Sequence, residues 1–583
     1  MSSEFGFTKS TKIIGILVFL LALCSGFVVS NPVYAAGQTY YVDIDTGVDA
    51  SGYGTSPSTP FKNIQYAANL TNPGDTVYVM NGTYYKTSDQ AVFQITRSGS
   101  ATGGYINYVA YPGHHPKLKA IDAWNHIIVN ASYIKIEGLE IEGDNANLTL
   151  SDGEARYNHF VQNNPTGTID WNYVRKTQTN GIYIAPVGGS TSYPHHVIIK
   201  NNIVHDVPGG GIGATSADYL TFESNTVYNN AWYTFYGNSG ISILTPKNAD
   251  SNTSTYRNII RNNRVYNNKT LVKWWKIQDY SDGNGIIIDS TQNAPAYTGK
   301  TLVTNNLVYL NGGSGIHSFK SADVDIINNT AYNNSSQLNY GEIFAQSSNN
   351  VNILNNIMVA RTGRNINTNY SNTNVTTNYN IYSNGNPVVS GSYDIWGDPL
   401  FMNAAGGDFR VKIGSNAIDT GTSSLAPSTD YVYNTRPRGA GPDRGAYESQ
   451  NLIGNPSFEW TNLGSWAKEL NSAGITVQNT GAYSGTYKAA FSTTAATKLA
   501  QTVTAAATKT YTVTAYINTN IASDVKLGAD VAGVNKGQVT VTPSGYKKAT
   551  FTINAAAGDA IKVWISAPAS AGGWVAIDDI SVE

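Results

Sequence analysis

The sequence predicts an all-β protein, in which a right-handed parallel β-helix is followed by a β-sandwich. Two observations predict the β-helix: a short motif recurs between about residues 120 and 360, and no stretch shows a sustained helical apolar period. A change of composition after Glu448 predicts the second domain. The chain has 583 residues, too many for one ordinary compact domain, so an elongated repeat or several domains are expected.

Composition excludes several classes of protein. Charged residues make up 13% of the chain and the net charge is −2, which excludes a globally basic nucleic-acid binder and an acidic disordered tail. The single cysteine, Cys24, leaves no intramolecular disulfide and no cysteine-based zinc site. Extensive backbone pairing and packing must therefore hold the chain together.

The first 35 residues have the pattern of a secretory signal peptide. Lys9 and Lys12 precede an apolar run over residues 13–29, and Ala35 ends a small-residue cleavage motif. A membrane anchor is the alternative, but the run is at the short end for a membrane span. We expect residues 1–35 to be removed and the protein to be secreted, as an extracellular bacterial protein without membrane attachment.

The repeat consists of an Asn-Asn or Ser-Asn pair that follows a short alternating strand and precedes a Gly-Ile strand. A coil of short strands at this period predicts a solenoid of the β-helix type, with a sandwich rich in asparagine loops as the alternative. Asparagine tolerates the left-handed conformation and can stack in a ladder down successive coils. The second residue of each pair is Asn202, Asn225, Asn263, Asn306, Asn329 and Asn356, at spacings of 23, 38, 43, 23 and 27 residues.

The two long coils carry inserts after Asn230 and after Asn268. Both inserts leave the same corner of consecutive coils, so they should be neighbours in space, and loops on a rigid scaffold often carry function. The segment from Lys247 to Lys276 contains seven basic residues and one acid, interleaved with aromatic residues. This pattern predicts a groove for an anionic polysaccharide, because aromatic rings stack on sugars and cations pair with carboxylates. A solvated basic face is the alternative, and nucleic acid is a weaker one.

The two ends of the repeat resemble those of a known superfamily. The motifs Thr39–Asp43, Phe61–Ala68 and Pro73–Val79 are similar to the N-terminal cap and first coil of secreted pectate-lyase-like β-helix proteins, and Ser415–Gly421 and Asp443–Glu448 are similar to their closing segment. The resemblance implies that residues 36–450 form a catalytic β-helix domain, with a short helix over its open end at residues 61–68. The fold hosts lyases, hydrolases, epimerases and adhesins, so it leaves the chemistry open.

Cleavage of a uronate polymer by β-elimination needs a base, a group that offsets the carboxylate charge, and an acid for the leaving oxygen. The Trp-Tyr-x-x-Tyr-Gly loop and the Asp-Gly-Asn-Gly-Ile strand resemble the β-helical alginate lyases of polysaccharide lyase family 31, which use a tyrosine and a lysine. The resemblance implies an alginate lyase with catalytic Tyr236 and Lys273, for which Tyr233 and Lys276 are alternatives, and no cofactor for catalysis. The expected substrate-binding residues are Trp232, Tyr233, Trp274, Trp275, Lys276, His205, His317, Asp282 and Asn284.

Three other functions remain open. A Ca²⁺-dependent pectate lyase needs a cluster of carboxylates, and the groove segment offers only the dispersed Asp279, Asp282 and Asp289. A glycoside hydrolase needs paired carboxylates, for which Asp282 and Asp289 are the candidates. The third alternative is a cell-surface solenoid that binds polysaccharide without catalysis.

Residues 451–583 lack the asparagine pairs and contain alternating stretches spaced like the strands of a β-sandwich. Their start, Asn455–Glu459, and their end, Ala576–Val582, resemble the first and last strands of jelly-roll carbohydrate-binding modules. The resemblance implies a structural Ca²⁺ with Glu459 and Asp578 as ligands, since oxygen donors suit this ion. A carboxylate pair without metal is the alternative. We expect a monomer that binds polysaccharide and neither nucleic acid nor membrane.

Overall fold

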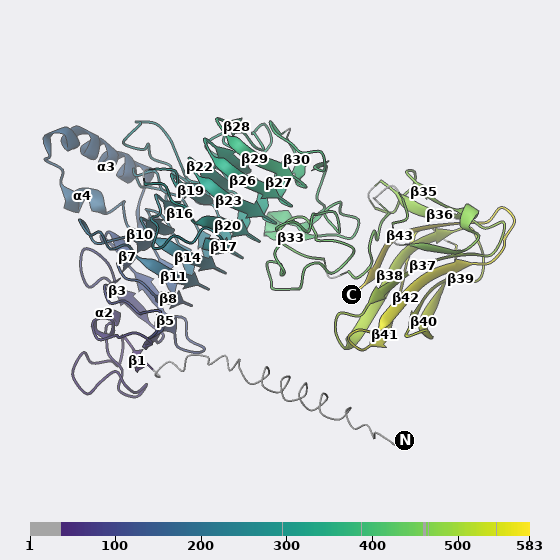
Figure 1. The fold of residues 1–583 in the computed structure, drawn as a ribbon, viewed down its shortest axis with the longest axis horizontal. Helices are drawn as coiled ribbons and strands as arrows, with labels where there is room; N and C mark the ends of the chain where they lie inside the picture. Colours follow the sequence, from purple (N-terminus) through teal and green to yellow (C-terminus); the bar gives the residue numbers. More distant parts are fainter. Residues whose placement is uncertain are drawn as a thin grey trace, which may run out of the picture.

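The computed structural model describes residues 37–583, apart from residues 294, 386, 450, 459–461, 465, 485 and 544. A three-sheet parallel β-helix is followed by a β-sandwich (Figure 1). The predicted all-β class, with a right-handed parallel β-helix before a sandwich, is therefore confirmed. The predicted signal peptide lies outside the described residues. Within the described part of the chain, no helix has the length and apolarity needed to cross a membrane.

Each complete coil places one strand in each of three parallel sheets. Sheet 1 contains β1 (Thr39–Val42), β2 (Thr76–Val79), β5 (Ile106–Ala110), β8 (Ile134–Glu137), β11 (His195–Lys200), β14 (Asp218–Glu223), β17 (Tyr256–Arg261), β20 (Lys300–Thr304), β23 (Ala322–Ile327), β26 (Asn349–Leu354) and β29 (Thr373–Asn378). Sheet 2 contains β4 (Phe93–Ile95), β7 (Asn125–Val129), β10 (Asn180–Ile184), β13 (Ile212–Thr215), β16 (Ile241–Leu244), β19 (Ile286–Asp289), β22 (Ile316–Phe319), β25 (Ile343–Gln346) and β28 (Asn369–Tyr370). Sheet 3 contains β3 (Thr83–Tyr85), β6 (Lys117–Lys119), β9 (Glu140–Glu142), β12 (Ile203–His205), β15 (Thr226–Tyr228), β18 (Arg264–Tyr266), β21 (Leu307–Tyr309), β24 (Thr330–Tyr332), β27 (Ile357–Val359), β30 (Ile381–Ser383) and β31 (Ile395–Trp396).

The Gly-Ile motif builds the core beneath sheet 2. The isoleucine of each motif points inward and pairs in register with the isoleucine of the next coil, and these side chains are fully buried. The preceding glycine lies at a tight corner: a β-carbon on Gly285 would lie 2.2 Å from Cγ1 of Val308. A side chain at this position would clash with the core, which explains why glycine recurs there. The stack of Gly-Ile isoleucines is Ile182, Ile212, Ile241, Ile286 and Ile316, and Ile343, which follows Glu342, continues it in the next coil.

The second asparagine of each pair forms a buried ladder along the β-helix, as predicted. The backbone N–H and the side-chain Nδ2 of Asn263 both donate to Oδ1 of Asn306, each at 3.0 Å. Asn306 repeats this arrangement with Asn329, both distances being 2.9 Å. The ladder ends where the backbone N–H of Asn380 donates to the carboxylate of Asp394 at 2.7 Å. A carboxylate only accepts hydrogen bonds, so it adds no donor that would need a partner in the next coil.

Replacing Asn306 with alanine should destabilise the β-helix strongly. The change removes the acceptor for both donors of Asn263, and each donor left buried without a partner costs about 1–3 kcal/mol. We expect the free energy of unfolding, measured by chemical denaturation, to fall accordingly. Asn349→Ala is the control, because Asn349 is exposed on β26 and its backbone is not left-handed, and its effect should stay within about 0.5 kcal/mol. Equal losses in both variants would refute the structural role of the ladder.

The first asparagine of a pair has a different role. Asn262, Asn305, Asn328 and Asn355 adopt the left-handed conformation, with φ between 54° and 57°. Their side chains face outward and donate to backbone carbonyls of the segment that closes the repeat. This segment therefore lies along the β-helix and is held at every coil that it passes. The carbonyls belong to Tyr431 at 2.8 Å, Thr429 at 2.7 Å, Asp443 at 2.7 Å and Thr422 at 2.8 Å respectively.

The sequence predicted one helix, and the structure contains it as α2 (Ile64–Ala68), whose buried side chains pack on the first strands. The structure also contains two helices that the sequence did not predict, α3 (Leu150–Asn163) and α4 (Trp171–Arg175), in an insert between β9 and β10. A capping box between Thr149 and Asp152 starts α3. Only three of its residues are buried, so it lacks a long apolar stripe. The other helical segments are η1 (Asn145–Asn147), η2 (Asn164–Thr166), η3 (Ala404–Gly406) and η4 (Ser472–Gly474).

After the β-helix, the hairpin β32 (Phe401–Asn403) and β33 (Asp408–Val411) precedes the closing segment, and two five-stranded antiparallel sheets then form the sandwich. Their facing apolar side chains make a separate core. Sheet 4 contains β34 (Ala467–Leu470), β37 (Thr497–Thr504), β42 (Ala560–Ala567), β39 (Val525–Val531) and β40 (Val534–Val541). Sheet 5 contains β35 (Ile475–Gln478), β36 (Lys488–Ser492), β43 (Trp574–Val582), β38 (Lys509–Thr519) and β41 (Lys547–Ala555).

Candidate active site

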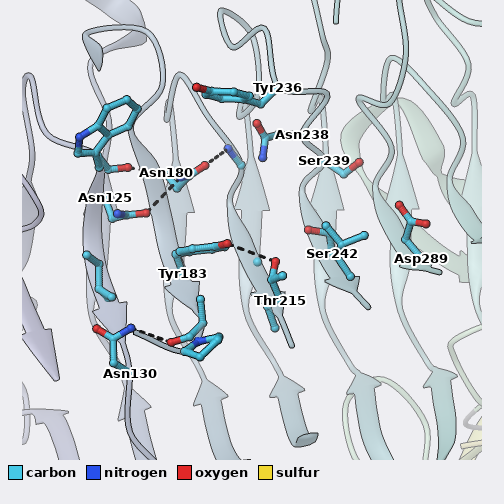
Figure 2. A pocket seen from close by; sticks show the side chains of 18 of the residues that line it. Asn125, Asn130, Asn180, Tyr183, Thr215, Tyr236, Asn238, Ser239, Ser242 and Asp289 are labelled. Atoms are coloured by element: carbon cyan, nitrogen blue, oxygen red, sulfur yellow. Dashed lines mark hydrogen bonds between the residues drawn. The ribbon is translucent and has the colours of Figure 1, made fainter. Parts of the chain in front are cut away.

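A groove of about 670 Å³ lies on the outer face of sheet 2 and crosses β7, β10, β13, β16 and β19 (Figure 2). Its floor is a row of outward side chains in register across these strands. Because neighbouring strands lie about 4.8 Å apart, the five strands span about 19 Å. The row consists of Ile128, Tyr183, Gly213, Ser242 and Ile287.

Three inserts that leave the corner between sheets 3 and 2 form one wall of the groove. The two predicted inserts lie side by side, since the N–H of Trp275 donates to the carbonyl of Phe235 at 3.1 Å. The helical insert packs on both of them through Phe160 of α3, whose ring lies 4.7 Å from Phe235 and 5.2 Å from Trp275. The wall is therefore a small apolar core of its own, which holds the groove residues in place.

Tyr236 projects from this wall into the groove (Figure 2). Its ring packs 4.7 Å from Phe235 and 6.0 Å from Phe160. Burial raises the pKa of the Tyr236 hydroxyl to about 12. The phenol is therefore protonated at neutral pH and can donate a proton to a leaving group.

Asp282 lines the groove beside Tyr236. It precedes β19 with a left-handed φ of 65°, and a β-carbon on Gly237, the residue after Tyr236, would lie 2.8 Å from Oδ2 of Asp282. Burial raises the pKa of the Asp282 carboxyl to about 7, against the opposing hydrogen bond from Ser281 at 2.9 Å. A carboxyl with this pKa exchanges protons near neutral pH, which suits a general base.

Neutral hydrogen-bond donors complete this part of the groove. The hydroxyl of Thr234 lies 2.8 Å from Oε1 of Gln178 and 3.0 Å from Oδ1 of Asn238, and can donate to one of them at a time. Nδ2 of Asn238 is directed toward the strands (Figure 2). The hydroxyl of Ser239 accepts a hydrogen bond from Asn284 at 3.2 Å, so its own proton can point into the groove. Asp289, at the end of β19, is the second carboxylate of the lining, and burial raises its pKa as well.

The groove is not basic, contrary to the sequence-based prediction. None of the described lining residues is lysine, arginine or histidine. The basic segment is dispersed instead: Arg257 is buried against Asp218, Arg261 pairs with Glu223 at 2.8 Å, and Arg264 donates to the hydroxyl of Tyr309 at 2.8 Å. These arginines hold neighbouring coils together.

The lysines expected at the site lie outside the groove lining. Lys273 is exposed, with Nζ 6.0 Å from the ring of Tyr280. Lys276 is also exposed, with Nζ 5.6 Å from the ring of Trp274 and 5.8 Å from that of Trp275. Both belong to the insert that carries Asp282, but their side chains are on its solvent side.

The remaining expected residues also stand mostly behind the lining. Trp232 donates through Nε1 to the carbonyl of Asn267 at 3.0 Å, and Tyr233 is buried. Asn284 is buried and accepts from the hydroxyl of Ser314 at 2.6 Å. His317 is buried in the next coil of sheet 2, beside Ile287, and neither ring nitrogen has a hydrogen-bond partner among the described residues. Burial lowers its pKa to about 3, so this imidazole is neutral.

His205 lies on sheet 3, away from the groove. With Glu140 and Glu142 it forms a described group whose ligand atoms are close enough to hold a metal ion. The ammonium of Lys117 already lies 3.1 Å from Glu140 and 2.5 Å from Glu142. The group is therefore an ion-pair network that links coils. Of the C-terminal residues, Asp578 is on β43, and Glu459 lies outside the described residues.

Sequence reasoning missed the amide and tryptophan residues of the groove. Trp124 directly precedes β7, Asn125 is the first residue of β7, and Asn180 is the first residue of β10. All three therefore lie where strands of sheet 2 start. Their sequence neighbourhood lacks the asparagine pair that marks later coils, and the helical insert separates Asn180 from Asn125 by 55 residues. Only the stacking of coils brings them to one surface.

A family model described as the Pel9A-like right-handed β-helix region matches residues 40–352, more than half of the chain. The chain belongs to the Pel9A-like right-handed β-helix family. The matched region contains every strand that crosses the groove, together with all three inserts of its wall. The search of curated proteins found no match.

Three of the solved structures that are similar to this Pel9A-like chain are polysaccharide lyases or a carbohydrate-binding module. Pectate lyase Pel9A is 15% identical, covers 72% of this chain and 98% of its own, and has a TM-score of 0.42. A rhamnogalacturonan lyase is 15% identical, with 63% and 91% coverage and a TM-score of 0.33. TmCBM61, solved with β-1,4-galactotriose, is 23% identical and covers 23% of this chain and 99% of its own, with a TM-score of 0.21.

Proposed function

We propose that the protein is a secreted polysaccharide lyase that cleaves a uronate-containing polysaccharide by β-elimination in the groove on sheet 2. The observation that carries this proposal is that Tyr236 and Asp282, an acid and a base of suitable pKa, line the same groove, where Asp282 lies beside Gly237, the residue after Tyr236. Membership of a family named after Pel9A, and a groove that crosses several coils, support a polymeric carbohydrate substrate.

In the proposed reaction the carboxylate of Asp282 removes the proton from C5 of a uronate. The electron pair forms the C4–C5 double bond as the C4–O4 bond breaks, and Tyr236 gives its proton to the leaving O4. The amide of Asn238 donates a hydrogen bond to the uronate carboxylate, where negative charge accumulates. Proton exchange with water then restores both groups. Asp282 takes the place of Lys273 as base, because Lys273 does not line the groove.

The test is a panel of alginate, polygalacturonate and rhamnogalacturonan, followed by the ultraviolet absorbance of the unsaturated uronyl product. The lyase produces this absorbance on at least one polymer; alginate is the substrate favoured by the loop around Tyr236. Absence of unsaturated product on every uronate polymer refutes the proposal. A Ca²⁺-dependent pectate lyase with a lysine base is not supported by the described lining, which holds two carboxylates, Asp282 and Asp289, and no lysine.

One observation favours a second candidate, a glycoside hydrolase. Both carboxyls of the lining have a pKa raised by burial, as a proton-donating carboxyl requires. A hydrolase would release reducing ends without ultraviolet absorbance. In that case Asp289→Asn would abolish turnover as fully as Asp282→Asn, whereas the lyase mechanism does not use Asp289.

We also propose that the C-terminal sandwich binds polysaccharide and holds a structural Ca²⁺ at Asp578 and Asp579. The two carboxylates are adjacent and buried, and among the described residues neither has a cationic partner. Asp578 accepts the N–H groups of Tyr483 and Ser484, and Asp579 accepts the hydroxyls of Ser457 and Ser484. Uncompensated buried carboxylates of this kind fit a hard cation with oxygen ligands.

Ca²⁺ should raise the Tm of the full-length protein relative to a chelated sample, because an ion that binds only the folded state stabilises it. The gain should disappear in Asp578→Asn. Asp524→Asn is the control, since Asp524 is exposed at the start of a strand and should leave the gain intact. A Tm that does not respond to Ca²⁺ in the wild-type protein would rule out the metal site.

A further inference from the structure

Two tryptophans meet at the end of the groove that is formed by the first coils. Trp124, which directly precedes β7, lines the groove and is half-buried. Trp171, the first residue of α4, lies beside it with 6.0 Å between ring centroids, and 47% of its surface is exposed. An aromatic side chain of this size that stays exposed beside a groove is available to bind a ligand.

The helical insert holds Trp171 rigidly. The carboxylate of Asp170 caps α4, and the other end of the helix is fixed by Arg175, whose guanidinium lies 3.1 Å from Asp122 and 3.1 Å from Asp89 of the coils below. Phe160 of α3 packs 6.1 Å from the Trp171 ring on the inner side. The exposed area is thus preorganised, and binding there costs little ordering of side chains.

We propose that Trp124 and Trp171 form a sugar-binding subsite that stacks on a pyranose ring of the substrate, next to the site of cleavage on the side of Tyr236. The inference rests on the proposed function for the identity of the polymer. Trp124 precedes β7 and Asp282 precedes β19, four strand spacings along the groove. The rings of Trp171 and Tyr236 lie 6.1 Å and 6.0 Å from the ring of Phe160, so the subsite lies close to the Tyr236 side of the reaction centre. One chain that follows the groove would contact both.

The chemistry of this end of the groove fits the apolar face of a sugar rather than its carboxylate. An indole ring offers a flat apolar surface to the C–H groups of a pyranose. The polar groups beside it are amides: Asn180 donates to Asn125 at 3.1 Å and accepts from the N–H of Gly210 at 3.0 Å. Amides bind hydroxyl groups as donors and as acceptors. The Arg175 guanidinium near this end of the groove is already paired with two carboxylates.

The test is a titration of intrinsic tryptophan fluorescence with hexasaccharides of galacturonate and of alginate, in an Asp282→Asn background that does not consume them. We expect Trp171→Ala to raise the Kd of the hexasaccharide about 2- to 10-fold, which corresponds to the binding free energy of one aromatic contact. In the catalytically intact protein the same change should raise KM and leave kcat within about twofold, since neither tryptophan transfers a proton in the reaction.

Two further variants keep the result interpretable. Trp171→Phe retains an aromatic ring and should recover part of the affinity. Trp396→Ala is the control, because Trp396 is 52% exposed on β31, outside the groove. It should change neither Kd nor KM. An unchanged Kd in Trp171→Ala, or no binding of either hexasaccharide to the unaltered platform, overturns the subsite. Binding through Trp171 without any lyase product would instead leave the subsite standing and refute the proposed reaction.

Discussion

Asp282→Asn and Tyr236→Phe should each lower turnover on the uronate substrate by about 10²- to 10⁴-fold, the usual effect of removing one proton-transfer group. Both changes keep the shape of the side chain and remove only its ability to take up or give a proton. Substrate affinity should therefore stay within a few-fold of the wild-type value. Steady-state kinetics on the responsive polymer measure both quantities.

The controls are the exposed lysines of the same insert. Lys273→Ala and Lys276→Ala should retain turnover within a few-fold, because neither side chain lines the groove. Any loss should appear in affinity for the polyanion and fade at high salt. If Lys273→Ala abolishes turnover while Asp282→Asn does not, the base is the lysine, and the insert must rearrange when substrate binds.

The same assignment fixes the direction of the pH dependence. Asp282 must be ionised to accept a proton, and its carboxyl has a pKa of about 7, so kcat/KM should rise with pH through this value. Tyr236 must stay protonated to donate, and its pKa of about 12 keeps it so across this range. A profile that is flat from acid to neutral pH would contradict the role of Asp282 as base.

Arg257→Ala should lower the free energy of unfolding by about 3–5 kcal/mol, because it leaves a buried carboxylate without its partner. Arg257 is fully buried and its guanidinium pairs with Asp218, which also accepts the hydroxyl of Tyr297 at 2.6 Å. The Arg257 guanidinium in addition lies 4.9 Å from the ring of Tyr219. Chemical denaturation of the full-length protein measures the loss.

Arg261→Ala is a matched control on the same strand, β17. Its guanidinium is partly exposed and pairs with Glu223 at 2.8 Å, so the loss should be about 1 kcal/mol or less. The double variant Arg257→Leu, Asp218→Asn should lose clearly less free energy of unfolding than the sum of the losses of the two single variants. The reason is that both buried charges are removed together. Similar losses for Arg257→Ala and Arg261→Ala would argue against the buried ion pair.

The basic segment illustrates why the character of the groove was predicted wrongly. Charge counted along the sequence does not say on which face a side chain emerges. On β17, Arg257 and Arg261 point outward from sheet 1, and the groove is on sheet 2. The insert between β18 and β19 does border the groove, yet it presents Asp282 to the groove and Lys273 to solvent.

The sequence by itself determined the β-helix, because the motifs that specify it are local and repeat. A glycine required by a tight corner, an isoleucine for the stack and an asparagine for the ladder recur in the coils from β10 to β22, and each of these motifs is recognisable from the local sequence alone. The position of the two inserts followed from the spacing of Asn225, Asn263 and Asn306 alone. Tyr236 was identified because it lies in one of those inserts.

The tertiary structure alone decided which residues share the groove. Trp124, Tyr236 and Asp282 come from three coils and more than 150 residues of sequence, and only the parallel stacking of coils brings them to the same ends of the strands. It also decided the pKa values of Tyr236 and Asp282, because the burial that raises them is a property of packing. Local motifs specify the scaffold, whereas the chemistry depends on contacts between segments whose separation no local pattern records.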